Sequence, residues 1–186
     1  HTIRAVMLST LAEGDSVIHN PLPSKDGLAA ANAARVFGAD VAIDKETKTW
    51  TVRGLGHRPA APAAVIDTMN SGTTTCFALG LGGLTEGYVV ITGDEQICRR
   101  PVKGQTKAME ELGATCIFTR PGNDCPPVLL GGPMTGGVCH LNGFSSQHIS
   151  GILLPAPLLD EGMQTEVIVE NPRELPYLQM TIDWMR

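Results

Sequence analysis

The hexapeptide Gly143-Phe144-Ser145-Ser146-Gln147-His148 stands between an alternating stretch, 137–142, and an apolar run, 149–159. The alternation is typical of a strand, and the apolar run has helical spacing. Ser145, Ser146 and Gln147 are therefore expected where a strand ends and a helix begins. Adjacent hydroxyls at such a junction can cap free backbone N–H groups, and the same N–H groups can bind an anion instead. Both interpretations stay open on this stretch alone.

The rest of the chain repeats this unit. Three similar tetrapeptides follow apolar helical runs: Leu11-Ala12-Glu13-Gly14, Leu84-Thr85-Glu86-Gly87 and Leu159-Asp160-Glu161-Gly162. We expect each glycine to be the left-handed cap past a helix. After each comes a β-rich stretch (17–19, 88–92 and 165–169) and then a second helix (24–37, 101–112 and 176–185). In the first two repeats, the second helix ends in a Gly-Ala pair and is followed by an expected hairpin, at 41–56 and 115–131.

One unit is therefore strand, helix, strand, helix, hairpin. The sequence begins inside an apparent helix, so we expect the first strand of unit one to be missing. It stops after the second helix of unit three, so we expect the hairpin of that unit to be missing as well. The pattern predicts an α/β fold. We expect residues 1–186 to form a single domain of three repeats at about 1–57, 58–132 and 133–186, with the first and last incomplete.

Composition narrows the class of protein. The chain has 186 residues, of which 42% are hydrophobic and 18% charged, as in a globular protein with a real core. Its net charge of −5, without a basic block, argues against a nucleic-acid partner. Pro155 and Pro157 interrupt the best candidate for a membrane span. Five cysteines without a C-x-x-C pair indicate reduced thiols, and so a cytoplasmic location.

Two further helix entrances carry binding signals. The segment 70–75 places Gly72 among hydroxyls directly after an expected strand at 64–68, so a ligand could approach the backbone closely. Arg4 and the pair Arg99-Arg100 stand in expected first turns, where cations are unfavourable unless they serve an anion. Alternatively, Arg4 is a solvated surface residue and the arginine pair is bound to Asp94 or Glu95.

These motifs, taken together, resemble those of a known family. They are Arg4-Ala5-Val6-Met7-Leu8, Asn70-Ser71-Gly72-Thr73-Thr74, Thr92-Gly93-Asp94 with Arg99-Arg100-Pro101, Ser145-Ser146-Gln147, and Pro176-Tyr177. In order and spacing, over essentially the whole chain, they are similar to the N-terminal half of the 5-enolpyruvylshikimate-3-phosphate synthases, the shikimate-pathway enzymes that glyphosate inhibits. The resemblance implies an enolpyruvyl transferase domain, an inside-out α/β barrel with helices inside and sheets outside.

The resemblance also implies an activity. The family transfers the enolpyruvyl group of phosphoenolpyruvate to the 5-hydroxyl of shikimate 3-phosphate in aromatic amino acid biosynthesis, without a metal or organic cofactor. By this resemblance, shikimate 3-phosphate would contact Arg4, Ser145, Ser146, Gln147 and Tyr177, and phosphoenolpyruvate would contact Gly72, Arg100 and Gln147. The partner would be the complementary enolpyruvyl transferase domain, which supplies the acid/base carboxylates. No catalytic residue is therefore assigned to this chain, and we expect it to be inactive alone.

Some positions depart from the family pattern. A Lys-Ser pair usual before the position of His1 is not in this sequence, Met69 replaces a usual Gly, and Cys76 replaces a usual Arg. Glu174 stands where many members have Ser, and a carboxylate beside a phosphate site is repulsive unless it points away. Two other functions remain: a UDP-sugar enolpyruvyl transferase domain, which the Ser145-Ser146-Gln147 and Pro176-Tyr177 motifs fit less well, and a non-catalytic domain that binds anions or packs against a partner.

Overall fold

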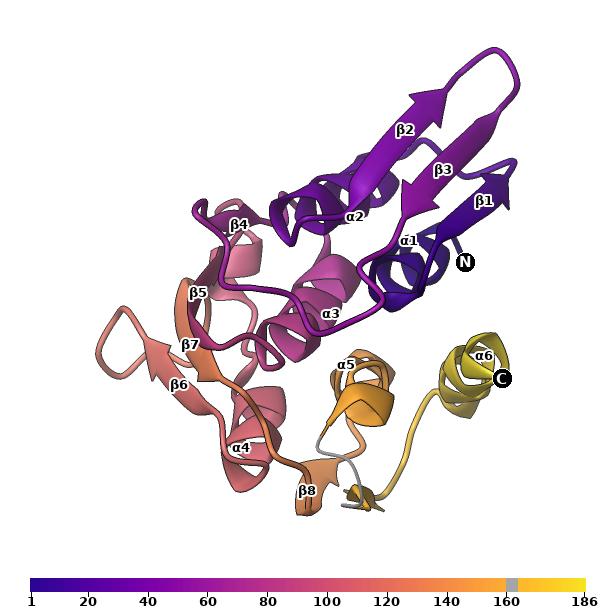
Figure 1. The fold of residues 1–186 in the computed structure, drawn as a ribbon. Coiled ribbons are helices and arrows are strands. Elements are labelled where there is room, and N and C mark those ends of the chain that lie inside the picture. The colour runs from indigo at the N-terminus through magenta and orange to yellow at the C-terminus, as the bar shows by residue number, and fades with distance from the viewer. Residues whose placement is uncertain (160–163) are drawn as a thin grey trace.

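Three small sheets lie on the outside of the molecule and the helices lie between them (Figure 1). The computed structural model describes residues 1–159 and 164–186. The first unit contains α1 (Thr2–Leu11), β1 (Asp15–His19), α2 (Lys25–Val36), β2 (Asp40–Asp44) and β3 (Thr49–Arg53). Its strands form an antiparallel sheet in the order β1-β3-β2.

The second unit repeats this arrangement and adds a strand. It contains β4 (Ile66–Asp67), α3 (Gly72–Gly82), β5 (Gly87–Thr92), the 3₁₀ helix η1 (Ile97–Arg99), α4 (Lys103–Glu111), β6 (Thr115–Phe118) and β7 (Val128–Gly132). The sheet order is β4-β5-β7-β6. Strand β4 is parallel to β5, and the other pairs are antiparallel. The order β5-β7-β6 corresponds to β1-β3-β2 of the first unit.

The third unit supplies the last sheet. It contains β8 (Val138–Asn142), α5 (Ser146–Leu153), the 3₁₀ helix η2 (Ala156–Leu158), β9 (Glu166–Glu170) and α6 (Leu175–Met185). Strands β8 and β9 pair in parallel, as β4 and β5 do. The predicted α/β class and the predicted helices and hairpins are therefore confirmed. The repeat boundaries and the single-domain assignment stay predictions.

The second helices end as their Gly-Ala pairs predict. Gly38 and Gly113 have φ angles of +105° and +96°, which favour glycine. Gly38 N–H donates to Arg35 O, and Ala39 N–H donates to Ala34 O, each at 3.0 Å. The amides of Gly113 and Ala114 make the equivalent two bonds at the end of α4. Both helices are therefore closed by the same left-handed cap.

The caps predicted at Gly14 and Gly87 are wrong. Helix α1 already ends at Leu11, and Ala12 is extended. Both glycines do have positive φ, but they lie at the entrances of β1 and β5. At Gly14 the reason is that the segment after β3 donates the amides of Leu55 and Gly56 to the carbonyls of Thr10 and Ala12. At Gly87 the preceding helix, α3, already ends at Gly82 with Gly83 as its cap. In the third tetrapeptide, residues 160–162 lie outside the described residues.

Helix α4 begins at Lys103, two residues later than the predicted Pro101. Val102 N–H donates to Asp124 O at 2.9 Å, which holds the preceding segment out of the helix. Arg99 therefore belongs to η1 rather than to a helix entrance.

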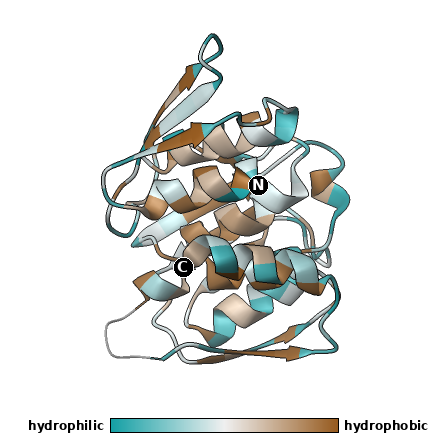
Figure 2. Ribbon diagram, turned by 90° about the vertical axis from the view of Figure 1, so that its right-hand side faces the viewer, coloured by the Kyte–Doolittle hydropathy of each residue, from teal (hydrophilic) through white to brown (hydrophobic). Residues whose placement is uncertain are grey.

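The core is centred on α3, in which every residue from Thr74 to Gly82 is buried. In helices α1 and α5, seven of ten and five of eight residues are buried, so these helices are largely buried as well. Helix α6 is more exposed, with only Leu178 and Thr181 buried. Figure 2 shows apolar segments on the helices between the sheets and hydrophilic connecting loops. All five cysteines are free thiols. Among the described helices, none has the length and apolar character needed to cross a bilayer.

Candidate functional site

The N-terminal ends of α3 and α5 lie side by side, with Gln147 between them. Gln147 Nε2 donates to Thr73 Oγ1 at 2.9 Å. On one side is a pocket of about 210 Å³, here named the Arg4 pocket, lined by Arg4, Thr73, Ser146, Gln147, Glu174 and Tyr177. On the other is a pocket of about 310 Å³, named the Arg100 pocket, lined by Gly72, Thr75, Cys76, Ile97, Arg100, Pro101, Val102, Gly104, Phe144, Ser145, Gln147 and His148. Gln147 lines both pockets.

Arg4 is held in place by a buried polar group on α6. Its Nε donates to Thr181 Oγ1 at 2.9 Å, and its Nη2 donates to Tyr177 O at 3.4 Å. The Thr181 hydroxyl donates to Tyr177 O at 3.0 Å and lies 2.9 Å from Ser150 Oγ on α5. Since Thr181 has one proton to give, the Ser150 hydroxyl donates in that last bond. Thr181 thus joins α1, α5 and α6 and orients the guanidinium.

The charge of Arg4 is buried beside neutral partners. Arg4 is 7% exposed, so the interpretation as a solvated surface arginine is wrong. Its guanidinium carbon lies 5.4 Å from the centre of the Phe77 ring. Within the described residues no carboxylate lies within ion-pair distance of it, and burial lowers the pKa of Arg4. A buried cation without an anionic partner is costly, and this one lines a pocket at a helix N-terminus.

The N-terminus of α5 is capped by a remote carboxylate. Ser24 and Ser71 cap their helices through Gly27 N–H and Thr74 N–H, but the Ser145 side chain makes no cap bond. Instead, Glu174 Oε2 accepts from Ser146 Oγ at 2.7 Å and from Ser146 N–H at 3.3 Å. Glu174 therefore points toward the expected phosphate position. Ser145 lines the Arg100 pocket and not the Arg4 pocket that Ser146 lines.

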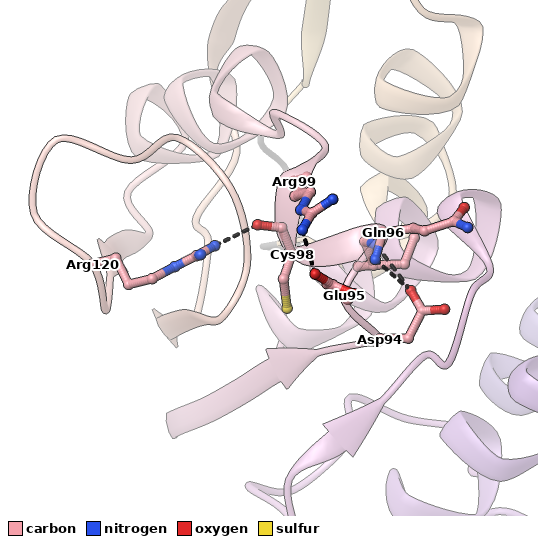
Figure 3. Close-up of polar contacts among 7 residues, drawn as sticks. Asp94, Glu95, Gln96, Cys98, Arg99 and Arg120 are labelled. Atoms are coloured by element: carbon pink, nitrogen blue, oxygen red, sulfur yellow. Dashed lines mark hydrogen bonds and ion pairs between the residues drawn. The ribbon is translucent and has the colours of Figure 1, made fainter.

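The loop before Arg100 is fixed by Asp94. Its Oδ1 accepts from Gln96 N–H and Ile97 N–H at 3.0 Å each, and its Oδ2 accepts from Asn70 Nδ2 at 2.5 Å. The bond from Asn70 and those from the two amides lower the pKa of the Asp94 carboxyl. Figure 3 shows the two backbone bonds of Asp94. This turn also joins α3's entrance, through Asn70, to the end of β5.

The two arginines have different surroundings. Arg99 forms an exposed ion pair with Glu95, which confirms the ion-pair alternative for that residue (Figure 3). Arg120, in the loop that follows β6, donates to Cys98 O and so braces the same segment. Arg100 lines the Arg100 pocket, and a Cβ built on Gly72 would lie 3.0 Å from Arg100 Nη1 and 3.6 Å from Gln147 Oε1. A side chain at position 72 would therefore crowd Arg100, and glycine leaves this space open.

The structure brings the seven predicted binding residues into two adjacent groups, with Gln147 in both. Arg4, Ser146, Gln147 and Tyr177 line the Arg4 pocket, and Gly72, Arg100, Ser145 and Gln147 line the Arg100 pocket. Sequence reasoning missed Thr181 and His148. Thr181 lies one helical turn after Tyr177 and so shares its helix face. That spacing is the sequence signal from which Thr181 could have been predicted. Burial lowers the pKa of His148, so a neutral imidazole lines the Arg100 pocket.

Two departures from the family pattern have simple structural consequences. Met69, in place of a usual Gly, has a φ of +53°, a conformation that glycine adopts more easily. Cys76, in place of a usual Arg, is buried in α3, and burial raises the pKa of its thiol to about 12. This thiol is therefore unreactive at neutral pH.

Comparison with known proteins identifies relatives along the whole chain. Residues 1–186 match the family described as EPSP synthase (3-phosphoshikimate 1-carboxyvinyltransferase). The chain is 40% identical over 185 residues to the 3-phosphoshikimate 1-carboxyvinyltransferase of Ruminiclostridium cellulolyticum, and 42% identical over 187 residues to that of Methanothermobacter thermautotrophicus. In each case the match covers 100% of this chain and 43% of the relative. The chain thus spans less than half the length of these curated relatives.

Solved structures agree with this assignment. EPSP synthase from Acinetobacter baumannii is 29% identical, with a TM-score of 0.82 over 93% of this chain and 39% of that protein. The enolpyruvyl transferase NikO from Streptomyces tendae, at 17% identity and a TM-score of 0.62, shares the fold. The chain belongs to the EPSP synthase family and corresponds to the N-terminal half of its relatives.

Proposed function

We propose that this chain is one half of a 3-phosphoshikimate 1-carboxyvinyltransferase, a transferase of aromatic amino acid biosynthesis. The Arg4 pocket would bind shikimate 3-phosphate, and the Arg100 pocket would bind phosphoenolpyruvate. The observation that carries the proposal is Arg4, a buried cation with neutral partners that lines a pocket beside the α5 N-terminus. An anionic ligand would offset the cost of burying that charge.

The arrangement suits a reaction between two anions. Gln147 lines both pockets, so one side chain can contact both ligands and hold the 5-hydroxyl of one beside the enolpyruvyl carbon of the other. The guanidinium groups of Arg4 and Arg100, with the ends of α3 and α5, would offset the charge of the ligands. A proton donor for the methylene carbon and a base for the hydroxyl would come from the complementary domain, which we propose as the partner of this domain, 1–186.

The proposal is tested by calorimetric titration with shikimate 3-phosphate. Binding is expected to be weak, on the order of millimolar, because the complementary domain supplies the rest of the enclosure. Arg4→Met should weaken it tenfold or more, roughly the loss of one charge-assisted contact. Arg53→Met removes the same charge from an exposed ion pair on β3 and should leave binding unchanged. Equal binding by the Arg4→Met chain, or preferential binding of a UDP-sugar, would contradict the proposal.

A further inference from the structure

Glu174 connects α6 to the start of α5 by an unusual contact. As the N-cap residue of α6 it makes no side-chain cap bond to its own helix. Its Oε2 accepts instead from the hydroxyl and the amide of Ser146, at 2.7 and 3.3 Å. Helices α5 and α6 pack against each other, which brings residues 28 positions apart into contact (Figure 1). The carboxylate therefore serves the N-terminus of a neighbouring helix.

The backbone that delivers this carboxylate is fixed. Arg173 N–H donates to Gly143 O at 3.0 Å, and Gly143 N–H donates to Glu170 O at 2.7 Å. A Cβ on Gly143 would lie 2.4 Å from Pro172 Cα, so the two segments meet backbone to backbone. Glu174 itself has a φ of +54° and ψ of 37°, a left-handed conformation that a glutamate adopts only when its surroundings impose it. The contact with Ser146 is thus built into the fold.

A carboxylate oxygen in this position uses the donors that a phosphate oxygen would need. Both groups are anionic acceptors that favour a hydroxyl and an amide at a helix N-terminus. Glu174 and Ser146 line the same pocket as Arg4. The Ser146 hydroxyl has one proton and its amide has another, so Glu174 and a ligand cannot both accept them fully. The Glu174 carboxylate and a phosphate bound to the same Ser146 donors would also repel each other.

We propose that Glu174 is a specificity-determining residue: its carboxylate occupies the phosphate position of the Arg4 pocket, and a phosphate-bearing ligand binds there only by displacing it. This inference rests on the proposed function for the identity of the ligand, but its chemistry concerns any phosphate. Displacement lowers the affinity for phosphate and leaves the affinity for a ligand that lacks phosphate unchanged. Glu174 thus reduces the preference of the pocket for a phosphorylated ligand over its unphosphorylated counterpart.

The test measures dissociation constants from the amide shift of Ser146 in the ¹⁵N-labelled chain. The probes are inorganic phosphate, shikimate 3-phosphate and shikimate. Glu174→Gln keeps the shape of the side chain without its charge, and Glu174→Ser removes both the charge and the reach of the side chain. Both should bind the two phosphate-bearing probes about tenfold more tightly than the native chain, as expected when a like charge is removed from the site. Shikimate should bind all three chains equally.

Glu166→Gln provides the matched control, because it removes the same charge from an exposed position on β9. It should leave every dissociation constant unchanged. Unaltered or weaker phosphate binding in both Glu174 variants would overturn the inference. The proposed function fails in a different way: the Glu174 variants would gain affinity for inorganic phosphate, yet shikimate 3-phosphate would bind no more tightly than phosphate itself.

Discussion

Arg4 shows how a binding residue can oppose stability. Its guanidinium is desolvated and bonded to neutral oxygens, and a buried cation of this kind can often be replaced by an apolar side chain without loss. We expect Arg4→Met to leave the free energy of unfolding unchanged or to raise it by about 1 kcal/mol. Urea denaturation measures this directly. A loss of more than about 2 kcal/mol would show that Arg4 is mainly structural.

Asp94 gives a pH dependence with a definite sign. Hydrogen bonds from Asn70 and from the amides of Ile97 and Gln96 lower the pKa of its carboxyl in the folded chain. A lowered acid pKa stabilises the fold above the ordinary value of 3.8, and this contribution is lost as the pH falls through the folded pKa. Native protein should therefore be more stable than Asp94→Asn at about pH 6, with a smaller difference at about pH 3. A difference that is constant with pH would contradict this account.

At the scale of elements, the spacing of α3 and α5 sets the geometry of both pockets. A Cβ on Gly80 would lie 1.9 Å from Gly151 O, so the two helices meet backbone to backbone. A Cβ on Gly82, two residues later, would lie 2.9 Å from a methyl group of Leu130, which can rotate away. Gly80→Ala should destabilise the chain by about 1–3 kcal/mol through overpacking and weaken ligand binding. Gly82→Ala should cause a smaller loss of stability and a smaller loss of ligand affinity.

Thermal unfolding and shikimate 3-phosphate titration of the two variants provide the comparison. Gly80 lies inside α3 and Gly82 is its last residue, so alanine gains at least as much helix propensity at position 80. A larger loss of stability in Gly80→Ala therefore reports the backbone contact. Equal stability of the two variants would mean that α5 moves freely relative to α3.

Most elements could be predicted from the sequence because their signals are local. Apolar periodicity located the helices, and the Gly-Ala pairs located the ends of α2 and α4. The errors occurred where long-range hydrogen bonds decide the outcome. Val102 N–H bonds Asp124 O and delays α4, and the chain after β3 replaces the cap expected at Gly14. No local pattern encodes either bond.

The site was predictable in part. The resemblance to the family predicted Arg4, Ser146 and Gln147 as binding residues, and the structure brings them into one pocket. Their binding roles stay proposals. The direction of Glu174 was not predictable, because it depends on the contact between α5 and α6 and on a left-handed backbone at residue 174. The sequence raised only the question of whether this carboxylate points away.

At the scale of the whole molecule, the proposed function leaves part of the catalysis to the complementary domain. The chain spans 43% of the length of its curated relatives, and transfer needs a proton donor, a base and a closed cleft. We expect no phosphate release from the pure chain with shikimate 3-phosphate and phosphoenolpyruvate. Release should appear on mixing with a chain that supplies the complementary domain, and Arg100→Ala should reduce it about a hundredfold or more. Steady turnover by the chain alone, abolished by Arg100→Ala, would contradict this expectation.

The central claim is that the pocket formed by Arg4, Ser146 and Gln147 binds the phosphorylated ligand within this one half. The most direct measurement is a titration of the ¹⁵N-labelled chain with shikimate 3-phosphate, followed residue by residue. The account predicts that the amides of Ser146 and Gln147 shift first and saturate at millimolar ligand, and that Arg4→Met moves saturation to a concentration about tenfold higher or more. Saturating shifts elsewhere on the chain, with the Ser146 and Gln147 amides unmoved, would contradict it.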